Sequence, residues 1–303
     1  MNKELNQHET QKMNYQAWLM AIRPRTLPAA AAGVVMGCAL AWYDGYFNIW
    51  ASIVCLMTAL LLQIGSNLAN DVFDYERGLD TEDRLGPTRV TQAGLLTPRQ
   101  VKGGMIIVFG LATLLGLYLA VLGGWPIILM GAASILAAIF YTAGPIPLGY
   151  YGLGDIFVFI FFGLVAVVGT YFVQAGTTSA DVWWMAVPLG LLITNILVVN
   201  NLRDLEYDRK GHKHTVAVVL GKKGTQIQYL LFVIISYLIV VLFAWEGIFP
   251  WATLLSWLSL VLAIQATWLV FTQTGRPLNA ALGKTGQAAL AFSLLFWLGL
   301  FLA

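Results

Sequence analysis

The sequence predicts an all-α, polytopic membrane protein with nine transmembrane helices. Of its 303 residues, 59% are hydrophobic and only 11% are charged, whereas charged residues make up about 25% of a typical soluble domain. A chain this apolar is expected to bury its surface in lipid rather than in one aqueous core. Long apolar runs favour helices over a barrel, because a helix satisfies its backbone hydrogen bonds within one segment.

Nine apolar runs approach the length, roughly 17 to 22 residues, that a helix needs to cross the hydrocarbon core. They are predicted at residues 27–43, 51–70, 103–122, 126–143, 154–174, 184–202, 226–245, 250–272 and 285–302. Glycine and proline separate several of them, as at Gly123, Gly124 and Pro126, which supports these breaks as turns between helices.

The distribution of basic residues predicts the orientation of these spans. All 17 lysines and arginines lie in four segments that nine spans would place on one side of the membrane: 1–26, 71–102, 203–225 and 273–284. Basic residues concentrate on the cytoplasmic side of membrane proteins. We therefore predict a cytoplasmic N-terminus, with residues 1–26 as a tail and interfacial segment and 27–303 as a single transmembrane domain. A net charge of only +2 gives no indication of nucleic acid as a partner.

Two of the predicted cytoplasmic loops, near 71–102 and 203–225, gather acidic residues where an apolar run ends. The first loop opens with NLANDVFDYERGLDTEDRLGP at 67–87 and carries six acids: Asp71, Asp74, Glu76, Asp80, Glu82 and Asp83. The second opens with NNLRDLEYDRKGHKHTVAVVLG at 200–221 and carries three: Asp204, Glu206 and Asp208. Such loops are often only solvated surfaces, but their shared position in the two halves favours a common function.

The spacing within each loop places the acids along one side of a helix. Asn67, Asp71 and Asp74 are spaced i, i+4 and i+7, and Asn200, Asp204 and Asp208 are spaced i, i+4 and i+8, so each set is predicted to form one stripe. Asn67 and Asn200 are 133 residues apart, and so are Asp71 and Asp204. Two matched pairs are a weak indication of an internal repeat.

Stripes of like charge repel unless a counter-charge lies between them. Mg²⁺ is the expected counter-charge, because it binds a few carboxylates together with the phosphate oxygens of a substrate. The chain has three histidines and two cysteines, and they form no competing ligand cluster. Basic residues interspersed with the acids can grip phosphate directly. The residues therefore predict two facing acidic stripes that hold Mg²⁺ and, through it, a diphosphate.

The two motifs, Asn70-Asp71-x-x-Asp74 and Asp204-x-x-x-Asp208, resemble the signature of the UbiA superfamily of intramembrane prenyltransferases. The first loop, NNLRDLEYDRKG, RPRTLP at 23–28 and YYGLGD at 150–155 are similar to the branch that prenylates 1,4-dihydroxy-2-naphthoate. Two features depart from the patterns expected for the family. Gly78 stands where the wider superfamily has an acid, and His212 follows Gly211 where a glycine is expected directly before the lysine.

This resemblance implies a nine-helix bundle around a cavity that opens to the cytoplasmic side of a bacterial inner membrane. The implied reaction is Mg²⁺-dependent transfer of a polyprenyl group from polyprenyl diphosphate to 1,4-dihydroxy-2-naphthoate. Loss of CO₂ would then give a demethylmenaquinone in menaquinone biosynthesis. The implied partners are these two substrates and the lipid bilayer.

The resemblance and the charges together suggest roles for individual residues. Metal ligands are predicted at Asn70, Asp71, Asp74, Asp204 and Asp208, of which the four aspartates are also the predicted catalytic residues. Substrate contacts are predicted at Asn67, Arg23, Arg77, Arg203, Arg209, Lys213 and Tyr141. For Arg23, binding of the acceptor carboxylate competes with ordinary snorkelling to the interface. For Tyr141, stabilisation of a carbocation competes with a place in an interfacial aromatic belt.

Two alternative functions remain at this point. The acceptor could be another aromatic compound, such as 4-hydroxybenzoate or homogentisate, within the same superfamily. From another class, an ion-coupled membrane transporter would also place acids in apolar helices. The acids of this chain lie at span ends on one side, which argues against a path across the membrane. The sequence does not indicate the prenyl chain length or the oligomeric state.

Overall fold

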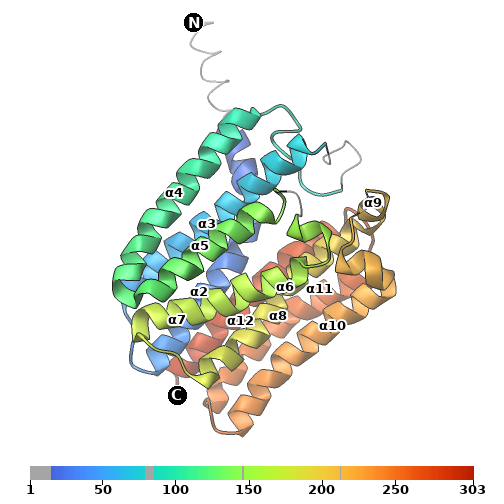
Figure 1. Ribbon diagram of the computed structural model, residues 1–303. Helices are drawn as coiled ribbons and strands as arrows, with labels where there is room; N and C mark the ends of the chain where they lie inside the picture. The colour runs from blue at the N-terminus through green and yellow to red at the C-terminus, as the bar shows by residue number, and fades with distance from the viewer. Residues whose placement is uncertain (1–14, 79–84, 145–146, 212) are drawn as a thin grey trace, which may run out of the picture.

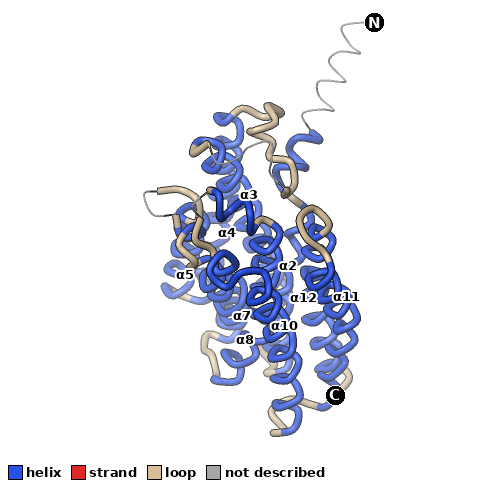
Figure 2. The backbone as a smooth tube through the Cα atoms, turned by 90° about the vertical axis from the view of Figure 1, so that its right-hand side faces the viewer, coloured by secondary structure: helices blue, strands red, loops and turns tan. Residues whose placement is uncertain are grey.

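The computed structural model describes residues 15–78, 85–144, 147–211 and 213–303 and shows an elongated bundle of helices (Figures 1 and 2). These residues contain no strand, so the prediction of an all-α protein is confirmed for them. The main helices are α2 (Leu27–Tyr43), α3 (Ile49–Glu76), α4 (Pro98–Gly123), α5 (Trp125–Phe140), α7 (Ala166–Ala175), α8 (Ala180–Arg203), α10 (Val216–Trp245), α11 (Leu260–Thr272) and α12 (Leu278–Phe301). The short elements are η1 (Pro24–Thr26), η2 (Leu148–Tyr150), α6 (Gly154–Val158), the π-helical η3 (Phe159–Val165), α9 (Leu205–Lys210) and η4 (Trp251–Ser259).

Eight helices within the described residues are long and apolar enough to cross a membrane. Eight of the nine predicted runs correspond to them. The run at 126–143 corresponds to α5, which is apolar but shorter, so the count of nine spans stays a prediction. The helices also extend beyond some predicted runs: α3 continues to Glu76 and α10 begins at Val216. These polar extensions carry parts of the acidic loops.

Some predictions concern residues whose structure is not described. Most of the predicted N-terminal tail (1–14) lies outside the described residues, as do Asp80, Glu82, Asp83 and His212. The cytoplasmic orientation and the assignment of 27–303 as one domain also stay predictions.

Polar side chains fix the first turns of several long helices. Asn48 accepts a hydrogen bond from the N–H of Ala51 at the start of α3, and Thr215 accepts one from Val218 at the start of α10. Thr97 forms a capping box with Gln100 at the start of α4. Such caps satisfy backbone donors that the helix itself leaves open. The caps explain why each of these helices begins at the residue directly after the capping side chain.

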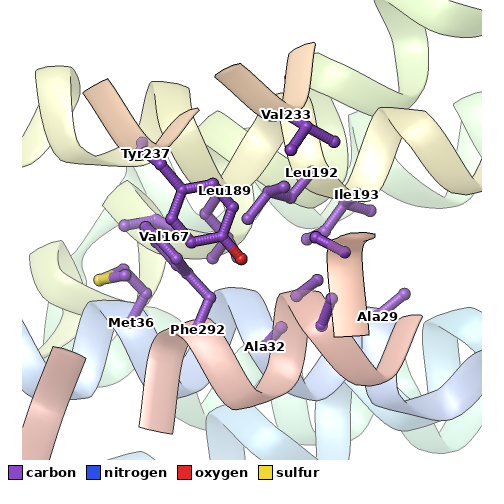
Figure 3. Close-up of a cluster of buried hydrophobic side chains, with 14 of the residues drawn as sticks. Ala29, Ala32, Met36, Val167, Leu189, Leu192, Ile193, Val233, Tyr237 and Phe292 are labelled. Atoms are coloured by element: carbon purple, nitrogen blue, oxygen red, sulfur yellow. The ribbon is translucent and has the colours of Figure 1, made fainter. Parts of the chain in front are cut away.

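Helix α8 lies at the centre of the main apolar core (Figure 3). Leu189 and Leu192 of α8 pack with Met36 of α2, Val233 of α10 and Phe292 of α12. A second core joins α3 and α4 around Leu68 and Phe109. The ends of α3 and α8, which carry the two acidic motifs, are thereby fixed by separate clusters of buried side chains.

Close packing between η3 and α8 depends on two glycines. A Cβ added to Gly163 would lie 2.5 Å from the Cα of Gly190, so no larger residue fits unless the helices move apart. Small residues let membrane helices approach closely and gain van der Waals contact. This contact helps set the position of α8 against the segment that begins at α6.

We expect Gly163→Ala to lower the free energy of unfolding by about 1–3 kcal/mol, because the added methyl group overpacks this contact. Gly110→Ala in α4 is the matched control. Its Cβ would meet no atom within 4 Å, and the loss of a helix-interior glycine should stabilise the protein by about 0.5–1 kcal/mol. Thermal unfolding in detergent measures both. Equal melting temperatures for the two variants would contradict the proposed close contact.

Candidate active site

A cavity of about 860 Å³ brings both acidic motifs together. Polar and aromatic residues at its lining come from distant parts of the chain: Asn67, Asn70, Asp74, Tyr141, Tyr150, Asn200, Asp204, Asp208 and Lys213. The predicted convergence of the two loops is therefore present in the described structure. Charged and neutral oxygen ligands share this part of the cavity with basic groups.

The rest of the cavity is mostly apolar and follows the length of the bundle. Its lining includes Ile127 at the first turn of α5 and Tyr141 just after the end of that helix. Leu119 of α4 and Val173 of α7 also line it. The cavity therefore suits a ligand with a long apolar body and an anionic head group.

Arg203 and Asp204 form a closed ion pair at the end of α8. The guanidinium of Arg203 donates from Nε to Oδ1 of Asp204 at 2.8 Å and from Nη2 to Oδ2 at 2.5 Å. The same guanidinium also donates to the side-chain oxygens of Asn200 and Asn279, both at 2.7 Å. The Arg203 side chain is fully buried, so this network fixes the direction of Asp204 at the cavity wall.

Asp208, one turn further on in α9, is the least satisfied carboxylate of the site. Its Oδ1 lies 3.6 Å from Nζ of Lys213, while its buried Oδ2 accepts no hydrogen bond among the described residues. Burial, together with the neighbouring Asp204, raises the pKa of the Asp208 carboxyl to about 6, although the positive charges of Lys213 and Arg203 lower it. A buried carboxylate oxygen without a donor is a natural position for a cation.

Asp74, at the end of α3, is held by two partners that also line the cavity. Its Oδ2 accepts from Nη2 of Arg89 at 2.6 Å, and its Oδ1 accepts from the hydroxyl of Tyr150 at 2.9 Å. The ammonium group of Lys213 lies 5.1 Å from the centre of the Tyr150 ring. Tyr150 therefore lies between the two motifs and contacts a charged residue from each.

Asp71 has different surroundings from Asp74, although both belong to the first motif. It is 1% exposed and is absent from the cavity lining. Its Oδ2 and Oδ1 accept from the backbone N–H groups of Val90 and Thr91, at 3.1 and 3.0 Å. Its Oδ2 also lies 3.9 Å from Nη2 of Arg23. The metal-ligand role predicted for Asp71 stays a prediction.

The two asparagines of the first motif line the cavity and also bind neighbouring segments. Asn67 donates to the carbonyl oxygen of Ile22 and to the hydroxyl of Thr26, both at 2.9 Å. Asn70 accepts from the hydroxyl of Thr142 at 3.2 Å. Asn67 thereby fixes the segment before α2, which carries Arg23.

The predicted substrate-contact residues divide into two groups. Arg23, Asn67, Tyr141, Arg203 and Lys213 line the cavity. Arg77 and Arg209 do not line it: Arg77 donates to the carbonyl oxygen of Gly144, and Arg209 pairs with Glu206 at 3.1 Å on an exposed surface.

Arg23 also has an unusual backbone. It is the one non-glycine residue with positive φ in the described chain, with φ 55° and ψ 68°. This left-handed conformation costs of order 1–3 kcal/mol for an ordinary residue and persists only where its surroundings enforce it. The side chain reaches the cavity beside Asp71, so the strain is located at the candidate site.

The donor set fits Mg²⁺ only in part without a substrate. Among the described residues, no group of three or more His, Cys, Asp or Glu side chains is close enough to hold a metal ion. Mg²⁺ rarely needs such a cage, because it keeps several waters and binds substrate phosphates with one or two carboxylates. The open Oδ2 of Asp208 and the nearby Asp204 fit that pattern.

Arg89 is the functional candidate that the sequence reasoning missed. It is buried, lines the cavity and pairs with Asp74. It lies in the segment GPTRVTQ between two helices, where a single arginine has no periodic pattern to mark it. Only the fold brings it to the end of α3.

The fold is that of a multi-pass membrane protein, with a cavity that is lined by charged and polar residues at one end and mostly by apolar residues elsewhere. A model of the UbiA prenyltransferase family matches residues 30–283. The chain belongs to the UbiA prenyltransferase family, whose members are enzymes of prenyl transfer.

Relatives of known name cover nearly the whole chain. It is 39% identical to the 1,4-dihydroxy-2-naphthoate octaprenyltransferase of Escherichia coli over 97% of this chain and 98% of that protein. The protein of the same name from Mycobacterium tuberculosis is 39% identical over 93% of this chain and 95% of its own. That from Bacillus subtilis is 30% identical over 100% and 98%.

Solved structures share the fold at low sequence identity. A UbiA homologue from Archaeoglobus fulgidus, bound to GPP and Mg²⁺, has a TM-score of 0.70 at 14% identity, covering 94% of this chain and 99% of its own. The apo structure of a UbiA homologue from Aeropyrum pernix has a TM-score of 0.66 at 16% identity, covering 93% and 97%. These similarities support the helical fold.

The Arg203–Asp204 pair can be tested by stability. We expect Arg203→Gln to lower the free energy of unfolding by about 3 kcal/mol or more, because it leaves the Asp204 carboxylate without its guanidinium in a buried place. Arg209→Gln is the matched control, since its pair with Glu206 is exposed and should contribute about 1 kcal/mol at most. Thermal or denaturant unfolding in detergent compares them. A loss no larger for Arg203→Gln than for the control would disprove the role of the network.

Proposed function

We propose that this enzyme transfers a polyprenyl group from polyprenyl diphosphate to 1,4-dihydroxy-2-naphthoate. The acceptor loses its carboxyl group as CO₂, and the other products are diphosphate and a prenylated 1,4-dihydroxynaphthalene. This product is a demethylmenaquinol, the reduced form of a demethylmenaquinone, an intermediate of menaquinone biosynthesis. The observation that carries the proposal is one cavity whose acidic and basic end is continuous with a long apolar part. The names of relatives that cover almost the whole chain support the acceptor.

The diphosphate of the donor is proposed to bind at the polar end of the cavity. Lys213 and Arg203 from one motif, and Arg89 beside the other, provide positive charge there. Cationic groups stabilise the negative charge that develops on the leaving diphosphate as its bond to the allylic carbon breaks. Arginine is suited to this role because its planar fork matches phosphate oxygens.

Asp74, Asp204 and Asp208 are the proposed ligands of Mg²⁺, with Asn70 as a neutral oxygen ligand. All four line the cavity, and the open Oδ2 of Asp208 supports the assignment. When bound, Mg²⁺ would neutralise charge on the leaving diphosphate.

The acceptor is proposed to lie between the polar end and the segment that carries Arg23. Arg23 lines the cavity, and its guanidinium is suited to pair with the naphthoate carboxylate. Aromatic rings at the same level, Tyr141 and Tyr150, can face the allylic cation and stabilise it through their ring quadrupoles. The prenyl tail would occupy the apolar part, where it also excludes water from the cation.

We further propose that the protein lies in a bacterial inner membrane with its N-terminus and the polar end of the cavity at the cytoplasmic side. The concentration of lysine and arginine in the predicted cytoplasmic segments supports this orientation. The water-soluble acceptor and the diphosphate would then meet the site from the cytoplasm.

The reaction is tested with purified protein in detergent. We expect a prenylated naphthohydroquinone, which air oxidises to the naphthoquinone on extraction, from 1,4-dihydroxy-2-naphthoate and a radiolabelled prenyl diphosphate. The product should be lost in EDTA and restored by Mg²⁺. Asp74→Ala and Asp208→Ala should each lower kcat/KM by about a hundredfold or more, since each removes a charge that acts on the leaving group. Glu206→Gln is the control, because that carboxylate is exposed.

The same assay with 4-hydroxybenzoate or homogentisate in place of 1,4-dihydroxy-2-naphthoate separates the remaining alternatives. Product with 4-hydroxybenzoate or homogentisate, and none with naphthoate, would refute the proposed acceptor and keep the family activity. Turnover that is unaffected by both aspartate substitutions would refute the metal assignment.

Because the pKa of Asp208 is raised, the Mg²⁺ concentration needed for half-maximal rate should depend on pH. Because burial raises the pKa of this carboxyl to about 6, protons compete with the cation as the pH falls through that value. The Mg²⁺ concentration for half-maximal rate should therefore increase below pH 6, by up to about tenfold per pH unit. Kinetics across this range measure the effect. Asp208→Asn, which cannot titrate, should need more Mg²⁺ at every pH and lose this pH dependence; the same dependence in that variant would contradict the role of Asp208.

A further inference from the structure

The two aspartates of the first motif have different partners. Asp74 lines the cavity, whereas Asp71 is 1% exposed and directs both of its oxygens at backbone N–H groups. Mg²⁺ demands near-octahedral geometry and keeps several waters. A hydrated ion cannot reach Asp71 in this arrangement unless the segment of Val90 and Thr91 moves away.

The groups that Asp71 binds belong to a compact turn. Within it, the N–H groups of Ala93, Gly94 and Leu95 donate to the carbonyl oxygens of Arg89, Thr91 and Val90, at 3.0, 3.1 and 3.0 Å. Asp71 accepts the N–H groups at the start of this turn, as a capping side chain does at a helix start. The carboxylate thus attaches the turn to α3.

Arg89 is the residue directly before the N–H groups that Asp71 binds. Arg89 lines the cavity, and its guanidinium pairs with Asp74 at 2.6 Å. Arg23 lies on the other side of Asp71, with 3.9 Å between Nη2 and Oδ2, and also lines the cavity. One buried carboxylate therefore lies between two arginines that face the substrate cavity.

We infer that Asp71 is a positioning residue for Arg89 and Arg23 and is not a metal ligand. It holds the turn so that the Arg89 guanidinium faces the end of α3, where the donor diphosphate is proposed to bind, and its charge favours the observed position of Arg23. This inference rests on the proposed function for the identity of the diphosphate. The division of roles within the motif rests on the contacts of Asp71 alone.

The test compares Asp71→Asn with Asp74→Asn in two titrations. An amide at position 71 can accept only one of the two N–H bonds, so the turn and Arg89 should shift. For Asp71→Asn we expect the KM for prenyl diphosphate to rise about tenfold, with the Mg²⁺ concentration for half-maximal rate changed by less than about twofold. Asp74→Asn should instead raise the Mg²⁺ requirement about tenfold or more. Glu76 lies on α3, as the two aspartates do, and its exposed carboxylate pairs with Lys102 of α4. Glu76→Gln should change neither quantity.

Metal binding is also measured without turnover. Mn²⁺, followed by its electron paramagnetic resonance signal, is titrated into protein that holds an unreactive thiodiphosphate analogue of the donor. Asp71→Asn should bind Mn²⁺ as the unchanged protein does, and Asp74→Asn should bind it more weakly. Weakening of Mn²⁺ binding by Asp71→Asn to the extent seen for Asp74→Asn would overturn the inference.

Two further variants connect Asp71 to Arg89. Arg89→Gln should reproduce the rise in KM, and the double variant Asp71→Asn with Arg89→Gln should be little worse than either single one, because both act on the same contact. Fully additive losses would contradict the inference. If Asp71→Asn does not fold, Thr91→Pro removes one N–H donor and leaves Asp71 unchanged. A raised KM with an unchanged Mg²⁺ requirement again supports positioning, and the reverse pattern overturns it.

Failure of the proposed function would be recognised separately. If the unchanged protein makes no product with any acceptor, the proposed reaction is refuted. The Mn²⁺ titrations of the two aspartate variants would still determine whether Asp71 is a ligand.

Discussion

The site depends on the pairing of buried carboxylates with donors that are buried beside them. Carboxylates at the mouth of an apolar bundle lose much of their hydration, and an unpaired charge there would be expensive. Asp74 is paired with Arg89, Asp204 with Arg203, and Asp71 with two backbone N–H groups. Each of these pairs joins the end of one motif helix to a neighbouring group. The charges therefore fix the geometry of the cavity mouth as well as provide its chemistry.

The carboxylates differ in how completely the protein already satisfies them, and they therefore differ in how readily they can bind a cation. Asp204 accepts two hydrogen bonds from Arg203. Asp208 instead retains a buried oxygen that has no hydrogen-bond donor among the described residues, and its other oxygen lies 3.6 Å from Nζ of Lys213. A cation bound at Asp208 would supply the partner that its open oxygen lacks. A cation bound at Asp204 would instead have to compete with the Arg203 guanidinium. In the proposed reaction a cation at Asp74 would also compete with Arg89 for that carboxylate. The Arg89 guanidinium would then be available to the diphosphate.

The sequence predicted the parts of this structure that depend on local pattern. Apolar run length predicted eight of the spans seen as long helices, and the spacing of Asn200, Asp204 and Asp208 predicted residues that share the cavity. It could not separate Asp71 from Asp74, because at 3.6 residues per turn the two lie only about 60° apart on α3. Which of them faces the cavity is decided by the turn around Val90, a tertiary contact without periodicity. For the same reason the sequence did not indicate Arg89.

The two motifs therefore differ more than their matching spacing suggests. Asp71 and Asp204 are 133 residues apart in corresponding positions, yet Asp204 lines the cavity and takes its counter-charge from the adjacent residue, while Asp71 lies behind the wall and binds the backbone of a distant turn. A buried carboxylate needs only some set of hydrogen-bond donors, so equal spacing in the sequence does not require equal partners in the structure. In this chain the first half uses its aspartate to bring a distant arginine to the site. The second half carries arginine and aspartate side by side at the end of α8, so no such turn is needed there.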